Sequence, residues 1–138
     1  MKFWGNVSLG FASGSLGGVV NALVLWFLVY FGVAQSVGIH FDLPSSLHGK
    51  EMMIYHQMVW GGIWGFLLLL PFLKERWFVR GLLLSLLPTL VVLFYLFPYR
   101  LGVGMCGIDY GTFTFILVLI VNAFWGVIAA AWYKSVRN

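Results

Sequence analysis

The hydrophobic residues of this chain fall into four long runs, separated by short segments in which polar residues, glycine and proline recur. The runs cover approximately residues 11–34, 52–73, 79–98 and 111–133. A bilayer core about 30 Å thick needs about 20 apolar residues per helix, so each run predicts one membrane-spanning helix. The runs take up most of the chain. We therefore expect a single domain over residues 1–138, an all-α, four-helix transmembrane bundle with short loops.

Composition supports this interpretation. Of the 138 residues, 62% are hydrophobic and only 9% are charged, and the mean hydropathy is +0.96. A soluble domain carries about 25% charged residues, so this chain lies outside that class. The lipid bilayer is accordingly its expected surroundings.

The distribution of basic residues predicts the orientation of the helices. Cytoplasmic connections carry an excess of Lys and Arg. The two termini and the second connection hold most of them, namely Lys2, Lys74, Arg76, Arg80, Lys134 and Arg137. The two other connections hold only Lys50 and Arg100. We expect both termini in the cytoplasm and, given the short connections, a bacterial inner membrane. Because the charges flank apolar runs, the net charge of +4 does not indicate a nucleic-acid partner.

Small residues recur at a spacing of four along the predicted helices. Lipid chains are as apolar as leucine, so helices associate in membranes through close backbone approach and interhelical hydrogen bonds. The spacing predicts tight packing, within the chain or against another membrane protein or a second copy. The glycines expected to provide it are Gly10, Gly14, Gly18, Gly61, Gly65 and Gly126.

Three polar residues lie at a similar depth in three of the predicted helices. Asn21, Thr89 and Asn122 are each about ten residues from the cytoplasmic end, or about 15 Å at 1.5 Å per residue. We expect them to form one polar layer near the bilayer midplane. The layer has two interpretations, structural hydrogen bonds across the bundle or a polar constriction in a transport pathway. Next to Thr89, Pro88 predicts a kink in the third helix.

No Asp, Glu, Lys, Arg or His falls in the central part of a predicted helix. Intramembrane ionisable groups mark proton relays and ion-coupling sites, so their absence disfavours a proton-coupled exporter. On the second helix, a helical wheel places His56, Trp60 and Trp64 on one side and Gly61 and Gly65 on the other. The histidine–tryptophan side is free to face lipid, a partner or a ligand.

Soft metal ligands gather on the predicted outer side. Imidazole, thioether and thiolate select Cu(I) or bind zinc. A low-specificity hypothesis is a Cu or Zn site there, whereas the simpler interpretation is that methionines fill gaps and histidines lie among the headgroups. No ligand pair has a fixed motif spacing, so no cofactor is expected. The residues of the hypothetical site are His48, Met52, His56, Met105 and Cys106.

The first outer connection has spaced apolar residues, which predicts a short interfacial segment over residues 38–50. No nucleophile, base and stabiliser can be assembled from the sequence, so we do not expect an enzyme. The primary hypothesis is an accessory or scaffolding subunit that acts through helix packing with another membrane protein. The alternative is a small oligomeric transporter or channel that uses the Asn21, Thr89 and Asn122 layer and the soft-ligand outer mouth.

Overall fold

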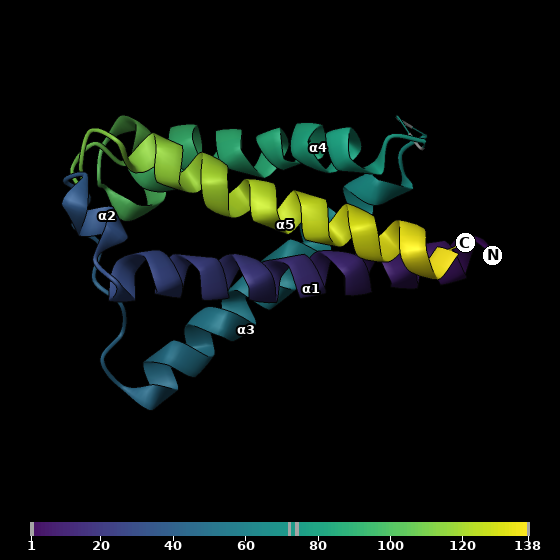
Figure 1. Cartoon of the computed structure of the whole chain (residues 1–138), viewed down its shortest axis with the longest axis horizontal. Coiled ribbons are helices and arrows are strands. Elements are labelled where there is room, and N and C mark those ends of the chain that lie inside the picture. Colours follow the sequence, from purple (N-terminus) through teal and green to yellow (C-terminus); the bar gives the residue numbers. More distant parts are fainter. Residues whose placement is uncertain (1, 72, 74, 138) are drawn as a thin grey trace.

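The computed structural model describes residues 2–71, 73 and 75–137. The described chain is 80% helical, without strands. Four helical stretches are long and apolar enough to cross a membrane, as the sequence predicts (Figure 1). They are Phe3–Tyr30, Leu47–Leu69, Trp77–Leu101 and Thr114–Arg137.

Two of the four stretches change helix type along their length. Helix α1 (Phe3–Tyr30) and helix α5 (Thr114–Arg137) are α-helical throughout, and a short helix α2 (Val33–Ser36) follows α1. Helix α3 (Leu47–Trp64) ends in the 3-10 helix η1 (Gly65–Leu69). Helix α4 (Trp77–Val91) continues as the π-helix η2 (Val92–Leu101), and the 3-10 turn η3 (Met105–Gly107) lies in the loop that follows.

The ends of the helices differ from the predicted runs. Helix α1 begins at Phe3 rather than near residue 11, and the segment before the apolar run contains no proline that would prevent this. It ends at Tyr30, just before Gly32, whose φ of 77° is the left-handed geometry that commonly ends helices. Helix α4 runs through Pro88, and the chain widens into a π-helix from Val92.

The helices are arranged in an open row and do not close into a ring. Helix α3 packs on α1, α1 on α5 and α5 on α4, whereas α3 and α4 share no substantial contact. Both termini lie at one end of the molecule, and we call the opposite end, where the loops after α1 and η2 lie, the outer end. The half of α3 nearest to this end diverges from the other helices (Figure 1). One side of the predicted bundle is therefore open between α3 and α4.

Glycines allow close backbone approach at the α1–α3 and α4–α5 contacts. A Cβ added at Gly61 would lie 2.6 Å from the backbone oxygen of Gly14, on the α1–α3 contact. A Cβ added at Gly81 would lie 2.5 Å from the backbone oxygen of Gly126, on the α4–α5 contact. The other predicted packing glycines also take part in α1–α3: Gly10 and Gly14 face Gly65, and Gly18 faces the backbone of Gln57.

The segment over residues 38–50 differs from the predicted interfacial element. It has no regular structure up to Ser46, whose side chain caps α3 by accepting the Gly49 N–H at 3.0 Å. Its first apolar residues turn inward, because Ile39 is buried and the rings of Phe41 and Tyr110 pack at 5.4 Å between centroids, whereas Leu47 at the start of α3 is exposed. The two outer connections are thus joined to each other.

At the end of the molecule that holds the termini, Arg80 connects the start of α4 to the end of η1. It was expected as a flanking charge, but its side chain is buried at the start of α4. The guanidinium donates to the backbone oxygen of Leu68 and, at 2.9 Å, to that of Leu70, and it lies over the Tyr133 ring. Arg80 therefore pairs carbonyls that the end of η1 leaves without helical partners.

Candidate functional site

The open side of the helix row contains two adjoining cavities of about 410 and 430 Å³. Ligand pockets usually measure roughly 300–1,000 Å³. The cavities lie between α1 and α3 on one side and η2 and α5 on the other, and we call them together the α3–η2 cleft. The residues that line both cavities are Asn21, His56, Gln57, Val92, Leu96, Arg100 and Asn122.

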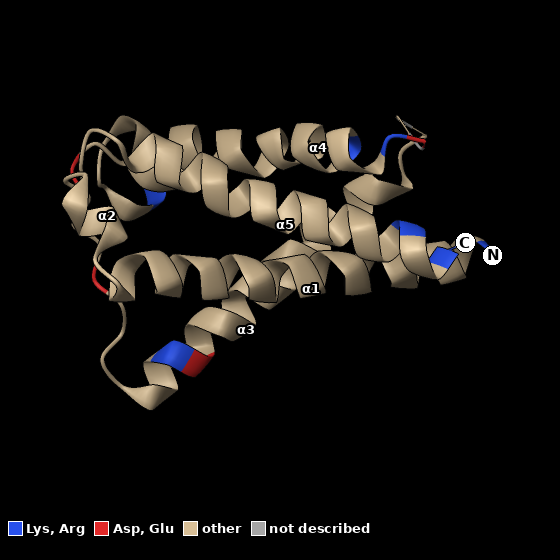
Figure 2. Ribbon diagram, in the orientation of Figure 1, with Lys and Arg blue, Asp and Glu red and all other residues tan. Residues whose placement is uncertain are grey.

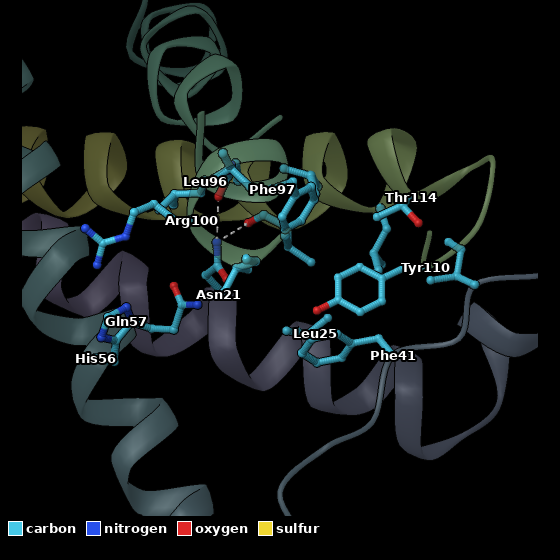
Figure 3. Close-up of a pocket in the computed structure, with 17 residues that line it drawn as sticks. Asn21, Leu25, Phe41, His56, Gln57, Leu96, Phe97, Arg100, Tyr110 and Thr114 are labelled. Atoms are coloured by element: carbon cyan, nitrogen blue, oxygen red, sulfur yellow. Dashed lines mark hydrogen bonds between the residues drawn. The ribbon is translucent and has the colours of Figure 1, made fainter. Parts of the chain in front are cut away.

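The first cavity runs toward the outer loops. Phe41 and Tyr110 line its outer end, together with Ile39 and Phe97 (Figure 3). A backbone hydrogen bond of 2.7 Å from the His40 N–H to the Tyr110 oxygen holds these two loop segments together. The outer end is therefore an apolar wall that joins both connections.

The second cavity opens sideways, between α3 and the α4–η2 stretch. Its lining includes Trp60, Trp64, Val91 and Tyr95. Trp60 is 50% exposed and Tyr95 is 54% exposed, although both lie within membrane-length helices. If these helices cross a bilayer, this opening faces the lipid chains.

The predicted polar layer forms the floor between the two cavities. The structure brings Asn21, Asn122 and Thr89 together through side-chain hydrogen bonds. Asn21 donates to the Asn122 side-chain oxygen at 2.9 Å and to the Val121 carbonyl at 3.2 Å. Asn122 donates to the Thr89 hydroxyl at 3.0 Å, and this hydroxyl donates to the Ser85 carbonyl at 2.8 Å. The layer connects α1, α5 and α4 in one hydrogen-bonded chain.

His56 lies beside this floor, within the membrane-length stretch Leu47–Leu69, which corrects the expectation that the central helix segments contain no ionisable residue. Gln57 meets α1 at Gly18, near the middle of that helix, so the adjacent His56 lies well below the outer end of α1. Arg100 extends from η2 toward the His56 and Gln57 end of the cavity, away from Tyr110 (Figure 3). Elsewhere, charged residues gather toward the helix ends (Figure 2).

Arg100, Gln57 and Trp125 were not identified from the sequence. The sequence places Arg100 in the second outer connection, because the apolar run ends at Pro98 and no sequence feature indicates that a π-helix continues beyond it. The Trp125 indole N–H lies 3.1 Å from the Gly14 oxygen and 3.3 Å from the Gly61 oxygen. Its position beside Asn122 and Gly126 was the available signal, since a buried tryptophan usually bonds through its N–H.

The hypothetical metal residues are not assembled into a site. Among the residues that the structure describes, no group of three or more His, Cys, Asp or Glu is placed to hold a metal ion. His56 instead lines the cleft, 6.2 Å from the Trp60 ring between centroids. His48 and Met52 lie in the diverging half of α3, and Met105 and Cys106 lie in η3. The Cu or Zn hypothesis therefore gains no geometric support.

Two known properties of π-helices bear on the cleft. They are rare, and single π-helical turns inside α-helices often occur at functional sites, whereas η2 is 10 residues long and follows the end of α4. Here η2 supplies Val92, Leu96 and Arg100 to both cavities.

Comparisons with protein-family models, curated proteins and solved structures found no match to this chain.

Proposed function

We propose that this protein binds an amphipathic molecule in the α3–η2 cleft, as a small membrane binding protein or carrier. One observation carries the proposal: a cleft of ligand size has mainly apolar walls and gathers its polar groups at one place. Binding sites for small molecules have this composition, with a few polar groups that fix the orientation of the ligand. The lateral opening beside Trp60 and Tyr95 offers an entry from the lipid phase.

A binding role agrees with the chemistry of the lining. Among the described residues that line the two cavities, none is Asp, Glu, Cys or Lys. The only described side chains of the lining from which His56 could take a proton to form a nucleophile are hydroxyls. The hydroxyl of Thr114 already donates to the Gly111 carbonyl at 2.8 Å. We therefore propose a function without catalysis.

An accessory or scaffolding subunit is the second candidate. The glycine stripes give it less support than expected, because the packing glycines face neighbouring helices of the same chain. The diverging outer half of α3 supports it, since Leu47, Met52, Tyr55 and Val59 are exposed there (Figure 1). A partner helix on this half would co-purify in fixed stoichiometry with the wild-type chain, and an Arg substitution at Tyr55 would release it.

We propose a bacterial inner membrane as the setting, with both termini in the cytoplasm. The excess of Lys and Arg at the termini and in the second connection supports this orientation. The common location of the two termini at one end of the molecule is consistent with it (Figure 1). In this orientation, the apolar wall of Phe41 and Tyr110 closes the cleft toward the periplasm.

The binding proposal is tested by filling the cleft. Leu96 lines both cavities, whereas Leu90 on α4 is exposed and lines neither. The full-length protein in a non-ionic detergent is titrated with oleate and with oleyl alcohol, and bound copies are counted by native mass spectrometry. We expect Leu96→Trp to abolish saturable binding of both probes and Leu90→Trp to preserve it. Equal binding by both variants would contradict the proposal.

A further inference from the structure

We propose that the α3–η2 cleft selects amphiphiles whose polar end is an oxyanion, with Arg100 as the recognising group and a single acyl chain in the first cavity. This inference rests on the proposed binding function and specifies its ligand class. Three features of the cleft support it: its positive charge, the hydrogen-bond donors that have no partner within the described part of the chain, and the space for an apolar tail.

The charge of the cleft is positive. Arg100 lines both cavities, and no carboxylate is among the described residues that line either one. A guanidinium stays protonated in proteins. Its side chain is exposed and lies in the last turn of η2, where a ligand can reach it. An anionic group on the ligand would supply the missing counter-charge, and a carboxylate or phosphate matches the guanidinium fork with two parallel hydrogen bonds.

Three of the four side-chain amide hydrogens of Asn21 and Asn122 have acceptors. Both amide hydrogens of Asn21 have acceptors, the Asn122 side chain and the Val121 carbonyl. The Asn122 amide donates to Thr89. This pattern assigns the layer a structural role and leaves recognition of a headgroup to other residues. His56 and Gln57 line both cavities together with Arg100 and add donors at the same end of the site (Figure 3).

The first cavity offers space for the apolar tail. From Arg100 and Asn21 it extends past Leu25 to the wall formed by Phe41 and Tyr110 (Figure 3). Its volume of about 410 Å³ lies near the lower end of the range of ligand pockets, which favours one chain over a two-chain lipid. A fatty acid or a lysophospholipid with a terminal phosphate has this form.

The experiment compares headgroups on one tail. Full-length protein in a non-ionic detergent is titrated with oleate, with oleoyl lysophosphatidate and with oleyl alcohol, and the dissociation constants are measured by native mass spectrometry. We expect both acids to bind at least tenfold more tightly than the alcohol. The order of the two acids identifies a carboxylate or a phosphate as the preferred headgroup, and either order supports the anion site.

Variants assign the preference to one side chain. Arg100→Gln is expected to weaken binding of both acids at least tenfold and to leave the alcohol within twofold. Arg100→Lys, which keeps the charge but loses the fork, is expected to give an intermediate affinity. Arg76→Gln removes an exposed cation outside the cleft and is expected to change nothing. Retained alcohol binding shows that each variant is folded.

The two proposals fail in different ways. Equal affinity of the wild type for acids and alcohol, or an unchanged preference in Arg100→Gln, would overturn the anion inference and leave the binding proposal standing. Saturable binding of none of the three probes would overturn both.

Discussion

Asn21 and Asn122 lie 101 residues apart in the sequence, and their side chains are joined by a hydrogen bond of 2.9 Å. This bond links α1 to α5, and the bond from Asn122 to Thr89 extends the connection to α4. A second bond at this depth, from the Asn21 amide to the Val121 carbonyl at 3.2 Å, joins the same two helices. The polar layer thus fixes the register of the helices that form the floor of the cleft.

A double-mutant cycle tests this relationship. Interhelical hydrogen bonds in membrane proteins average about 0.6 kcal/mol, with a maximum near 1.7 kcal/mol. We expect Asn21→Leu and Asn122→Leu to couple by this amount when the unfolding free energy is measured in lipid–detergent micelles. Thr89→Val should couple with Asn122→Leu but not with Asn21→Leu, since Thr89 bonds only to Asn122 of the two. Additive effects of Asn21→Leu and Asn122→Leu would contradict the account.

The glycines of the α1–α3 contact predict a graded effect along one helix. A Cβ at Gly14 would lie 2.6 Å from the Cα of Gly65, whereas a Cβ at Gly10 would lie 3.2 Å from the nearest atom, the Gly65 oxygen. We expect Gly14→Ala to lower the unfolding free energy by about 1–3 kcal/mol, as overpacking does. Gly10→Ala should have a much smaller effect, because the gain in helix propensity of about 0.5–1 kcal/mol offsets the tighter contact. The same unfolding measurement checks both, and equal effects would argue against this packing.

Arg80 is predicted to stabilise the end of the molecule that holds the termini, through its two carbonyl contacts. Arg80→Met leaves the Leu68 and Leu70 oxygens without this donor, and a buried group left unpaired costs about 1–3 kcal/mol. Arg80→Lys should recover only part of the loss, since an ammonium does not reproduce the planar fork. Arg76→Met, at an exposed position, is the matched control and should be neutral in thermal unfolding. A loss of stability in the control equal to that of Arg80→Met would refute a specific role.

The proposed orientation is tested with the single cysteine of the chain. Cys106 lies in the loop between η2 and α5, at the end opposite to the termini, and is partly exposed. A membrane-impermeant maleimide should label it in intact spheroplasts. In a Cys106→Ser background, a cysteine placed at the exposed Ser135 should be labelled only after permeabilisation. The reverse pattern would place the termini outside.

The features that the sequence could predict are those with local causes. Apolar runs of membrane length predict the four helices, and the depth of each asparagine follows from its distance to the helix end, so the partners of the polar layer could be named in advance. The position of His56 beside the polar layer could not be predicted from the sequence. It depends on the register of α3 against α1, which the contact between Gly18 and Gln57 sets.

Two other features, the position of Arg100 and the cleft itself, could not be predicted from the sequence, for related reasons. Arg100 enters the cleft because the chain continues past Pro98 as a π-helix, a conformation that neither apolar periodicity nor residue type indicates. The cleft itself exists because α3 and α4 do not pack against each other. Stripes of small residues predict that helices meet, but they do not specify which pairs remain apart.

The most direct test of the account maps where an amphiphile resides. The protein is reconstituted in a bilayer with a trace of fatty acid that carries a photoreactive diazirine on its chain, irradiated, digested and sequenced by mass spectrometry. We predict labels concentrated on cleft residues of η2 and α3, such as Val92, Leu96 and Trp60, and their loss in Leu96→Trp. Labels spread over exposed positions outside the cleft, such as Leu90 and Ile120, and unchanged in Leu96→Trp, would contradict a binding site between α3 and η2.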